Sequence, residues 1–253
     1  MILKHIKPDP SKVPGFWDIK ETPIISIGNQ KNIFENKSIM MIENLLSNES
    51  CDSLIDIFLN CGIEAPVSVN GLKDDKVYGK GSKRATGWSE TIANQLSELI
   101  IPHLDILYCD NKTATDWWQD EQRCYTWKPI AVSPMLRFMK YEKDSEHYAH
   151  YDAGYFYPDN EHRTLKSVVI YLTTNNTCAT RFINDGQKEL DVWDRNHEDW
   201  NRPVNKDELV LLSHSRKGKV LIFDHRLCHD VEKYDGAEGN RIIIRTDIIY
   251  KKI

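Results

Sequence analysis

Paired cysteines, long apolar runs and a strong charge of one sign are all missing from this 253-residue sequence. Its six cysteines form no C-x-x-C pair, which argues against a disulfide framework and favours reduced, buried thiols. No stretch reaches the roughly 18 apolar residues of a membrane span, and the amino terminus lacks the apolar stretch of a signal peptide, so we expect a soluble cytoplasmic protein. A net charge of -5 argues against a broad phosphate-binding face, so neither nucleic acid nor membrane is expected as a partner.

Internal repeats and low-complexity tracts are also missing, so nothing in the sequence divides the chain into separate units. At this length about 70 to 75% of the unfolded surface can be buried, which is enough for one large core. We therefore predict a single domain over 1–253. It comprises an N-terminal arm with early edge strands (1–40), a helical support with a flap loop (41–130) and a jelly-roll core (131–253).

The middle part shows helical periodicity in two places. Ser50 opens one amphipathic helix, and Ser89 caps a second over Glu90–Ile101 that Pro102 should end or kink. The apolar stripe of the first helix is predicted to consist of Leu54, Ile55, Phe58 and Leu59. Between the helices, the Gly- and Lys-rich segment Val67–Trp88 is predicted to be a mobile loop that closes over substrate.

Short strand patterns with turn residues between them dominate from residue 131 onward. Such a pattern is typical of an antiparallel barrel or jelly roll. The predicted fold class is therefore mainly β with supporting helices, built on a double-stranded β-helix (jelly roll, cupin-like) core.

A histidine and a carboxylate two residues apart, His150 and Asp152, lie in the second strand of a predicted strand-turn-strand unit. Side chains at i and i+2 of a strand point to the same side, so both can reach one metal ion. The triplet alone is weak, because a second one occurs at His197-Glu-Asp199. That second triplet lies in a polar stretch without alternation and is predicted to be a solvated loop.

A distal histidine completes the predicted metal site. His229 ends a Phe-Asp-His-Arg-Leu-Cys-His run, and two imidazoles with one carboxylate leave three positions of an octahedral Fe(II) ion open. His225 in the same run is the alternative distal ligand, while His147 is predicted to be a local hydrogen-bonding residue.

The last predicted strand places Arg241, Arg245 and Asp247 on one face, with isoleucines on the other. If that face is the barrel interior, its guanidinium groups need an anion, either Asp247 or a bound dicarboxylate. A planar guanidinium binds a carboxylate with two hydrogen bonds, which suits one carboxylate of such a dicarboxylate.

The order of these motifs resembles that of the 2-oxoglutarate and Fe(II)-dependent dioxygenases, in particular their prolyl 4-hydroxylase-like branch. The motifs are R-F-x-K-Y ending at Tyr141, His150-x-Asp152, V-V-I-Y-L around Tyr171, Thr180-x-Phe182, G-K-V-L-I-F ending at Phe223, His229 and G-x-R ending at Arg241. The match runs from about Met135 to Tyr250 and continues more faintly upstream, where Arg84-Ala-Thr-Gly-Trp88 resembles an R-x-S/T-G segment.

The resemblance implies a metal site of His150, Asp152 and His229, with no catalytic amino acid beyond the metal centre. For 2-oxoglutarate it implies contacts from Arg241, Tyr171 and Tyr141. An apparent insertion at Tyr234–Glu238 leaves Arg245 as an alternative to Arg241. Arg84 is the implied substrate contact, whereas Thr180 and Phe182 are expected to serve in core packing.

The implied activity is hydroxylation of a C–H bond with Fe(II), 2-oxoglutarate and O2, with ascorbate as a candidate reductant. Within this branch the expected substrate is a prolyl residue in a peptide or protein. Two alternatives stay open, a free amino acid or other small molecule as substrate, and a metal-binding barrel without turnover.

Overall fold

The computed structural model describes residues 5–13, 15–35, 38–62, 65–66, 79–80, 82–108, 125–185 and 204–253. Within these residues the α-helices are α1 (Asn48–Asn60) and α2 (Glu90–Ile100). The strands are β1 (Phe16–Asp18), β2 (Lys31–Glu35), β3 (Ile39–Glu43), β4 (Ala65–Pro66), β5 (Gly79–Lys80), β6 (Lys83–Trp88), β7 (Leu107–Tyr108), β8 (Thr126–Val132), β9 (Met135–Tyr141), β10 (Glu146–His150), β11 (His162–Tyr171), β12 (Asn175–Ile183), β13 (Leu209–Ser215), β14 (Val220–Asp224), β15 (His229–Val231) and β16 (Arg241–Lys252).

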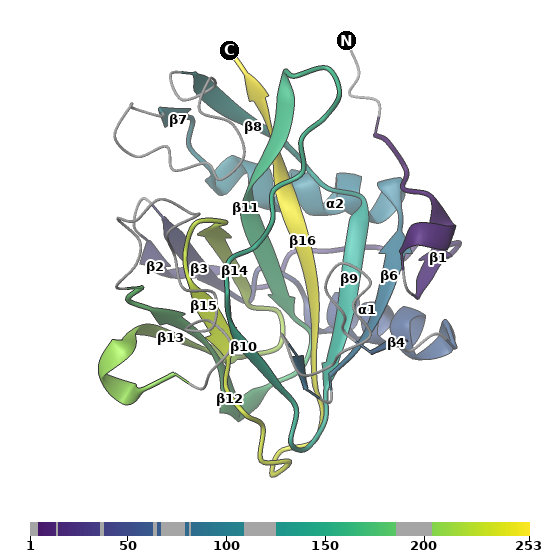
Figure 1. Cartoon of the computed structure of the whole chain (residues 1–253). Helices are drawn as coiled ribbons and strands as arrows, with labels where there is room; N and C mark the ends of the chain where they lie inside the picture. The colour runs from purple at the N-terminus through teal and green to yellow at the C-terminus, as the bar shows by residue number, and fades with distance from the viewer. Residues whose placement is uncertain are drawn as a thin grey trace.

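Two sheets face one another (Figure 1). The larger, here the major sheet, has the order β1-β6-β9-β16-β11-β14-β3-β2, with β4, β7 and β8 attached; the minor sheet has the order β13-β12-β15-β10-β5. The eight strands from β9 to β16 divide equally between the sheets, in the orders β9-β16-β11-β14 and β13-β12-β15-β10. This antiparallel arrangement is the jelly roll that the strand pattern predicted.

The alternation along β16 separates two hydrophobic cores. Ile242, Ile244 and Ile248 belong to the cluster under the helices, whereas Ile243 belongs to the cluster between the sheets. Arg241 and Arg245 share the parity of Ile243, so they face the space between the sheets, which is the side the sequence predicted for them.

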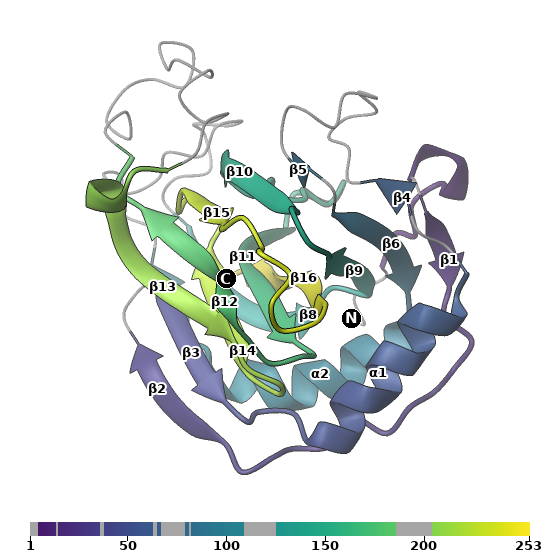
Figure 2. The same cartoon turned by 90° about the horizontal axis from the view of Figure 1, so that it is seen from below.

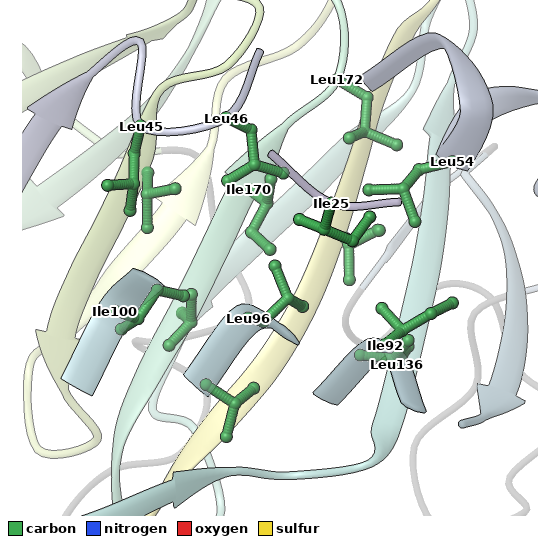
Figure 3. Packing of buried hydrophobic residues seen from close by; sticks show 14 of the residues in the cluster. Ile25, Leu45, Leu46, Leu54, Ile92, Leu96, Ile100, Leu136, Ile170 and Leu172 are labelled. Carbon is green, nitrogen blue, oxygen red and sulfur yellow. The ribbon is translucent and has the colours of Figure 1, made fainter. Parts of the chain in front are cut away.

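The helices cover the outer face of the major sheet (Figure 2). In Figure 3, Ile92, Leu96 and Ile100 of α2 pack in one cluster with Leu136 of β9 and Ile170 of β11. All five side chains are fully buried, and burying one such side chain contributes roughly 1.5 to 3 kcal/mol. This outer core holds the major sheet rigid behind the candidate site.

Both helices begin close to where the sequence predicted. Ser89 caps α2 through its side chain, and a short 3-10 turn containing Pro102 follows the helix. The cap of α1 is Ser47, because its hydroxyl accepts from the Ser50 amide. The predicted stripe of α1 is wrong at Leu59, which is 53% exposed, since the buried face turns toward Ile57.

The predicted loop Val67–Trp88 is wrong at Gly79–Lys80, which form β5, and at its last six residues. Lys83–Trp88 forms β6 and pairs with β9 along its whole length, although lysine and glycine made the segment look like a loop. Gly87 is required there, because a Cβ atom would lie 2.5 Å from the Ile19 side chain. Residues 67–78 and 81 lie outside the described residues.

The segment 41–130, predicted to be mainly helical, also contributes β3, β6 and β8 to the major sheet. Pairing with distant strands makes these segments strands, and local periodicity alone could not reveal that pairing. At one edge of the major sheet β1 pairs in parallel with β6, and at the opposite edge β2 pairs with β3. None of the helices described is long and apolar enough to cross a membrane.

Candidate active site

His150, Asp152 and His229 come together between the sheets. His150 ends β10 and stands opposite His229, the first residue of β15, while Asp152 follows two residues after His150. One ligand atom from each of the three lies within 4.8 Å of the others. The structure thus brings together the three residues predicted from the H-x-D spacing and the distal histidine.

Both imidazoles are oriented by backbone carbonyl groups. Nδ1 of His150 lies 2.7 Å from the Tyr148 carbonyl oxygen, and Nδ1 of His229 lies 2.9 Å from that of Leu227. A carbonyl can only accept, so Nδ1 carries the proton in each neutral ring and Nε2 keeps its lone pair. Each Nε2 faces Asp152, at 3.8 Å and 3.7 Å from a carboxylate oxygen.

Burial keeps these histidines neutral. It lowers the pKa of His150 to about 4, helped by the neighbouring His229, and it also lowers the pKa of His229. Metal ions bind the neutral imidazole, so both rings are in their ligand form at neutral pH.

Asp152 is ionised despite its burial. Burial alone would raise its pKa, but the nearby Arg245 guanidinium holds that pKa well below the usual range. Arg245 donates to one carboxylate oxygen at 3.0 Å, and the Ser167 hydroxyl donates to the other. The carboxylate is therefore charged and fixed in orientation.

Two imidazole nitrogens and one carboxylate oxygen on one face of a metal ion form a donor set that suits Fe(II). This set leaves the other coordination positions open. The neutral imidazoles and the ionised carboxylate at this position are chemically ready to hold such an ion. The residues present therefore fit a mononuclear non-haem iron site.

Arg245 belongs to an ion-pair network. Besides Asp152 it contacts Asp247 at 3.1 Å, and Asp247 also receives Arg137 at 3.0 Å and His225 at 3.2 Å. His225, the alternative distal ligand, is thus engaged by Asp247 and is not part of the metal-ligand cluster. Arg245 likewise already holds two carboxylates.

Arg241 is in the opposite situation. Its side chain is 0% exposed, and Nη2 donates to Thr180 Oγ1 at 2.8 Å. Nε and Nη1 have no hydrogen-bond partner, and no carboxylate among the described residues forms an ion pair with the guanidinium. Its Cζ lies 4.7 Å from the ring centroid of Tyr141 and 5.4 Å from that of Tyr171.

A buried guanidinium with two unused donors calls for an anion. Nε and Nη1 are the kind of planar donors that grip a carboxylate with two hydrogen bonds. Among the described residues no carboxylate pairs with Arg241 as Asp152 pairs with Arg245. The free donors of Arg241 therefore suit a dicarboxylate such as 2-oxoglutarate, whereas Arg245 is already paired with Asp152 and Asp247.

Tyr171 lies beside the Arg241 guanidinium. Its hydroxyl is 3.1 Å from Thr180 Oγ1 and 3.1 Å from Ser213 Oγ, so it has polar partners on the minor sheet. Tyr141 is also buried, which raises its pKa to about 12 and keeps the phenol protonated at neutral pH.

Thr180 and Ser167 are site residues that sequence reasoning missed. Thr180 was expected to serve in packing, yet its hydroxyl oxygen accepts from Arg241. The expectation is correct for Phe182, which is 3% exposed and packs edge-on against Phe223. The position of Arg241 on the inward face of β16 could have indicated that a polar residue lies opposite it. Nothing in the sequence around Ser167 indicated a role for that residue.

Arg84 lies on β6, not on a flap, and pairs with Met139 of β9. Burial and the nearby guanidiniums of Arg137 and Arg245 lower its pKa to about 10. Arg84 therefore lies near the guanidinium groups of Arg137 and Arg245. The alternative triplet His197-Glu-Asp199 lies outside the described residues.

The fold is shared with solved oxygenase structures, although no protein-family model matches the sequence and no curated protein matches it significantly. HygX from Streptomyces hygroscopicus, solved with nickel and 2-oxoglutarate bound, aligns over 85% of this chain and 82% of its own, with 12% identity and a TM-score of 0.52. The non-haem alpha-ketoglutarate-dependent carbocyclase SnoK from nogalamycin biosynthesis aligns over 85% and 79%, with 13% identity and a TM-score of 0.50.

A viral collagen prolyl hydroxylase from Paramecium Bursaria Chlorella virus-1 aligns over 87% of this chain and 99% of its own, with 16% identity and a TM-score of 0.43. The chain thus has the jelly-roll fold found in 2-oxoglutarate/Fe(II) oxygenase structures, as the motif order led us to expect.

Proposed function

We propose that this protein is an Fe(II)- and 2-oxoglutarate-dependent dioxygenase and that its single domain spans 1–253. His150, Asp152 and His229 hold the iron, and Arg241 binds the distal carboxylate of 2-oxoglutarate with help from Tyr171 and Tyr141. The observation that carries the proposal is the buried Arg241 guanidinium, whose Nε and Nη1 have no partner, in the same inter-sheet space as the His-Asp-His cluster.

In this proposal the protein's own residues bind the metal and the co-substrate and orient them. When bound, Fe(II) and 2-oxoglutarate supply with O2 the oxidising chemistry that hydroxylates a C–H bond and releases succinate and carbon dioxide. Arg245 and Ser167 fix the Asp152 carboxylate, while the carbonyl groups of Tyr148 and Leu227 fix the imidazoles. No amino-acid nucleophile or acid-base residue is needed beyond the metal centre.

For the substrate we propose a prolyl residue in a peptide or protein, which rests on the resemblance of the motifs to the prolyl 4-hydroxylase-like branch. A small molecule is the second candidate, supported by the shared fold with SnoK, whose description is that of a carbocyclase in nogalamycin biosynthesis. Arg84, near the Arg137 and Arg245 guanidinium groups, is the proposed substrate contact.

Turnover of 2-oxoglutarate tests the proposal. Purified protein with Fe(II) and 2-oxoglutarate in air should release succinate slowly, and a correct substrate should stimulate that release. Ascorbate is expected to sustain turnover by keeping iron in the Fe(II) state. Asp152→Ala should release none, whereas equal release by Asp152→Ala and wild type would refute the assigned metal site.

A panel of proline-containing peptides, free amino acids and other small molecules then decides the substrate class. Stimulation by peptides, lost in Arg84→Ala while the slow basal reaction persists, would support the prolyl assignment. Stimulation by small molecules alone would replace it. Binding of metal and 2-oxoglutarate with no succinate from any of them would favour the third possibility, a barrel without turnover.

A further inference from the structure

Lys219 is a buried lysine that the proposed metal and co-substrate contacts do not use. It directly precedes β14 and is 3% exposed, which is rare for a lysine. Its backbone pairs with Tyr171, and its Nζ crosses toward the minor sheet, where it donates to the His214 carbonyl oxygen. The amino group also lies 4.9 Å from the centroid of the Tyr171 ring. Lys219 therefore ends between the sheets.

The same ring has a second cation beside it. Arg241 Cζ lies 5.4 Å from the Tyr171 centroid, so the two charged groups are no more than about 10 Å apart. Neither side chain forms an ion pair with a carboxylate among the described residues. Glu43 is the one acid that raises the pKa of Lys219, and it acts without direct contact. Two buried positive charges thus share one aromatic ring.

Such a pair is costly without an anion, because charges repel more strongly in a buried site than in water. Burial, together with the nearby charges of Arg216 and Arg241, lowers the pKa of Lys219 to about 8 against the attraction of Glu43. A carboxylate bound by Arg241 would relieve the repulsion between the two cations.

We propose that Lys219 is a second cationic positioning residue of the 2-oxoglutarate subsite, acting by its charge across the Tyr171 ring while Arg241 makes the direct hydrogen bonds. This inference rests on the proposed function. Because the His214 carbonyl holds Nζ in place, Lys219 favours any ligand that carries a second carboxylate near Arg241 and the Tyr171 ring. It therefore selects a dicarboxylate over a monocarboxylate keto acid.

Proton linkage follows from the same arrangement. The charged and titratable groups around Lys219 are Glu43 on β3, Tyr171 on β11, His214 on β13, Arg216 in the turn before β14 and Arg241 on β16. A bound carboxylate raises the pKa of Lys219 from about 8 toward its ordinary value. Below that pKa the lysine is already charged, and above it binding must take up a proton, so affinity falls by about fivefold between pH 7 and pH 9.

Calorimetric titration of 2-oxoglutarate into the full-length protein loaded with Ni(II) tests the inference. Lys219→Met should weaken binding at pH 7 by about tenfold and flatten its pH dependence, with Ni(II) affinity unchanged. Lys219→Arg should restore most of the affinity. The matched control is Lys217→Met, which removes a cation two residues away that pairs with Asp52 on the surface and should bind like wild type.

The affinity of the wild type for 2-oxoglutarate should fall from pH 7 to pH 9, and this measurement needs no variant. Equal affinity and equal pH dependence in wild type and Lys219→Met would overturn the role of Lys219. An affinity that does not change with pH in the wild type would overturn it as well. Wild type that binds Ni(II) but no 2-oxoglutarate would instead refute the proposed function, so the two failures are distinct.

Discussion

The Arg245 guanidinium lies 3.0 Å from the Asp152 carboxylate, whereas Arg241, four residues earlier on the same face of β16, contacts no described carboxylate. One strand therefore serves two purposes. Arg245 orients Asp152, the proposed metal ligand, and Arg241 keeps two donor groups without a partner. The proposed metal site and the proposed co-substrate site thus involve different residues of β16 and can be tested separately.

Replacing Arg241 should affect the co-substrate only. Arg241→Ala removes the bidentate partner of a partly buried carboxylate, which should cost about 2 to 5 kcal/mol, or a 30-fold to several-thousand-fold rise in the apparent KM for 2-oxoglutarate. Metal affinity should stay close to that of wild type. The measurement is initial-rate kinetics of succinate release with 2-oxoglutarate varied.

Arg245→Ala is the matched control for that experiment. It should weaken metal binding by about 10- to 100-fold, because it removes a partner of the ligand Asp152, and it should change the 2-oxoglutarate KM less than Arg241→Ala does. The reverse order of the two KM effects would exchange the roles of the arginines.

Thr180→Val tests the pocket from the minor sheet. The substitution keeps the side-chain volume but leaves Arg241 Nη2 and the Tyr171 hydroxyl without their shared acceptor. A hydrogen bond to a charged group is worth about 1.5 to 3 kcal/mol, so the 2-oxoglutarate KM should rise by roughly 10- to 150-fold. Thr246→Val, a buried change on the helix side of β16, should leave that KM unaltered.

Asp152→Ala tests the metal site by binding. Titration with Ni(II), followed by calorimetry, should show a specific site in wild type and none in the variant, while far-ultraviolet circular dichroism stays the same. Asp199→Ala removes the carboxylate of the second H-x-D triplet and should bind Ni(II) like wild type. Loss of binding in Asp199→Ala and not in Asp152→Ala would transfer the site to the other triplet.

The buried histidines predict acid lability of the metal-free protein. Because the pKa of His150 falls from 6.5 to about 4 on folding, its contribution to stability is complete above pH 6.5 and is lost as the pH falls toward 4. That loss amounts to about 3 kcal/mol. Urea unfolding at pH 7 and pH 4.5 should show this decrease, and His150→Asn should show a smaller one.

Much of the site was predictable because it depends on local periodicity. His150 and Asp152 are two residues apart near a strand end, and alternation along β16 fixed the side of Arg241 and Arg245. The choice between the arginines was not predictable. It depends on which carboxylates face them across the sheets, and Asp152 lies far away in sequence from Arg245.

The remaining parts of the fold and of the site could not be predicted from the sequence because they depend on pairing between distant segments. Lys83–Trp88 looks like a loop by composition, and only its register with β9 makes it a strand. Thr180 joins the pocket because β12 faces β16 across the barrel, which leaves no signal in the spacing of residues. Lys219 was assigned no role from the sequence, although its side chain is buried inside the protein.

A crystal structure with Ni(II) and 2-oxoglutarate bound, grown without O2, tests the central claim most directly. The account predicts the metal at about 2 Å from Nε2 of His150, Nε2 of His229 and a carboxylate oxygen of Asp152. It also predicts the distal carboxylate of 2-oxoglutarate at about 2.7 to 2.9 Å from Arg241 Nε and Nη1. A distal carboxylate bound to Arg245, or a metal bound away from these three ligands, would contradict it.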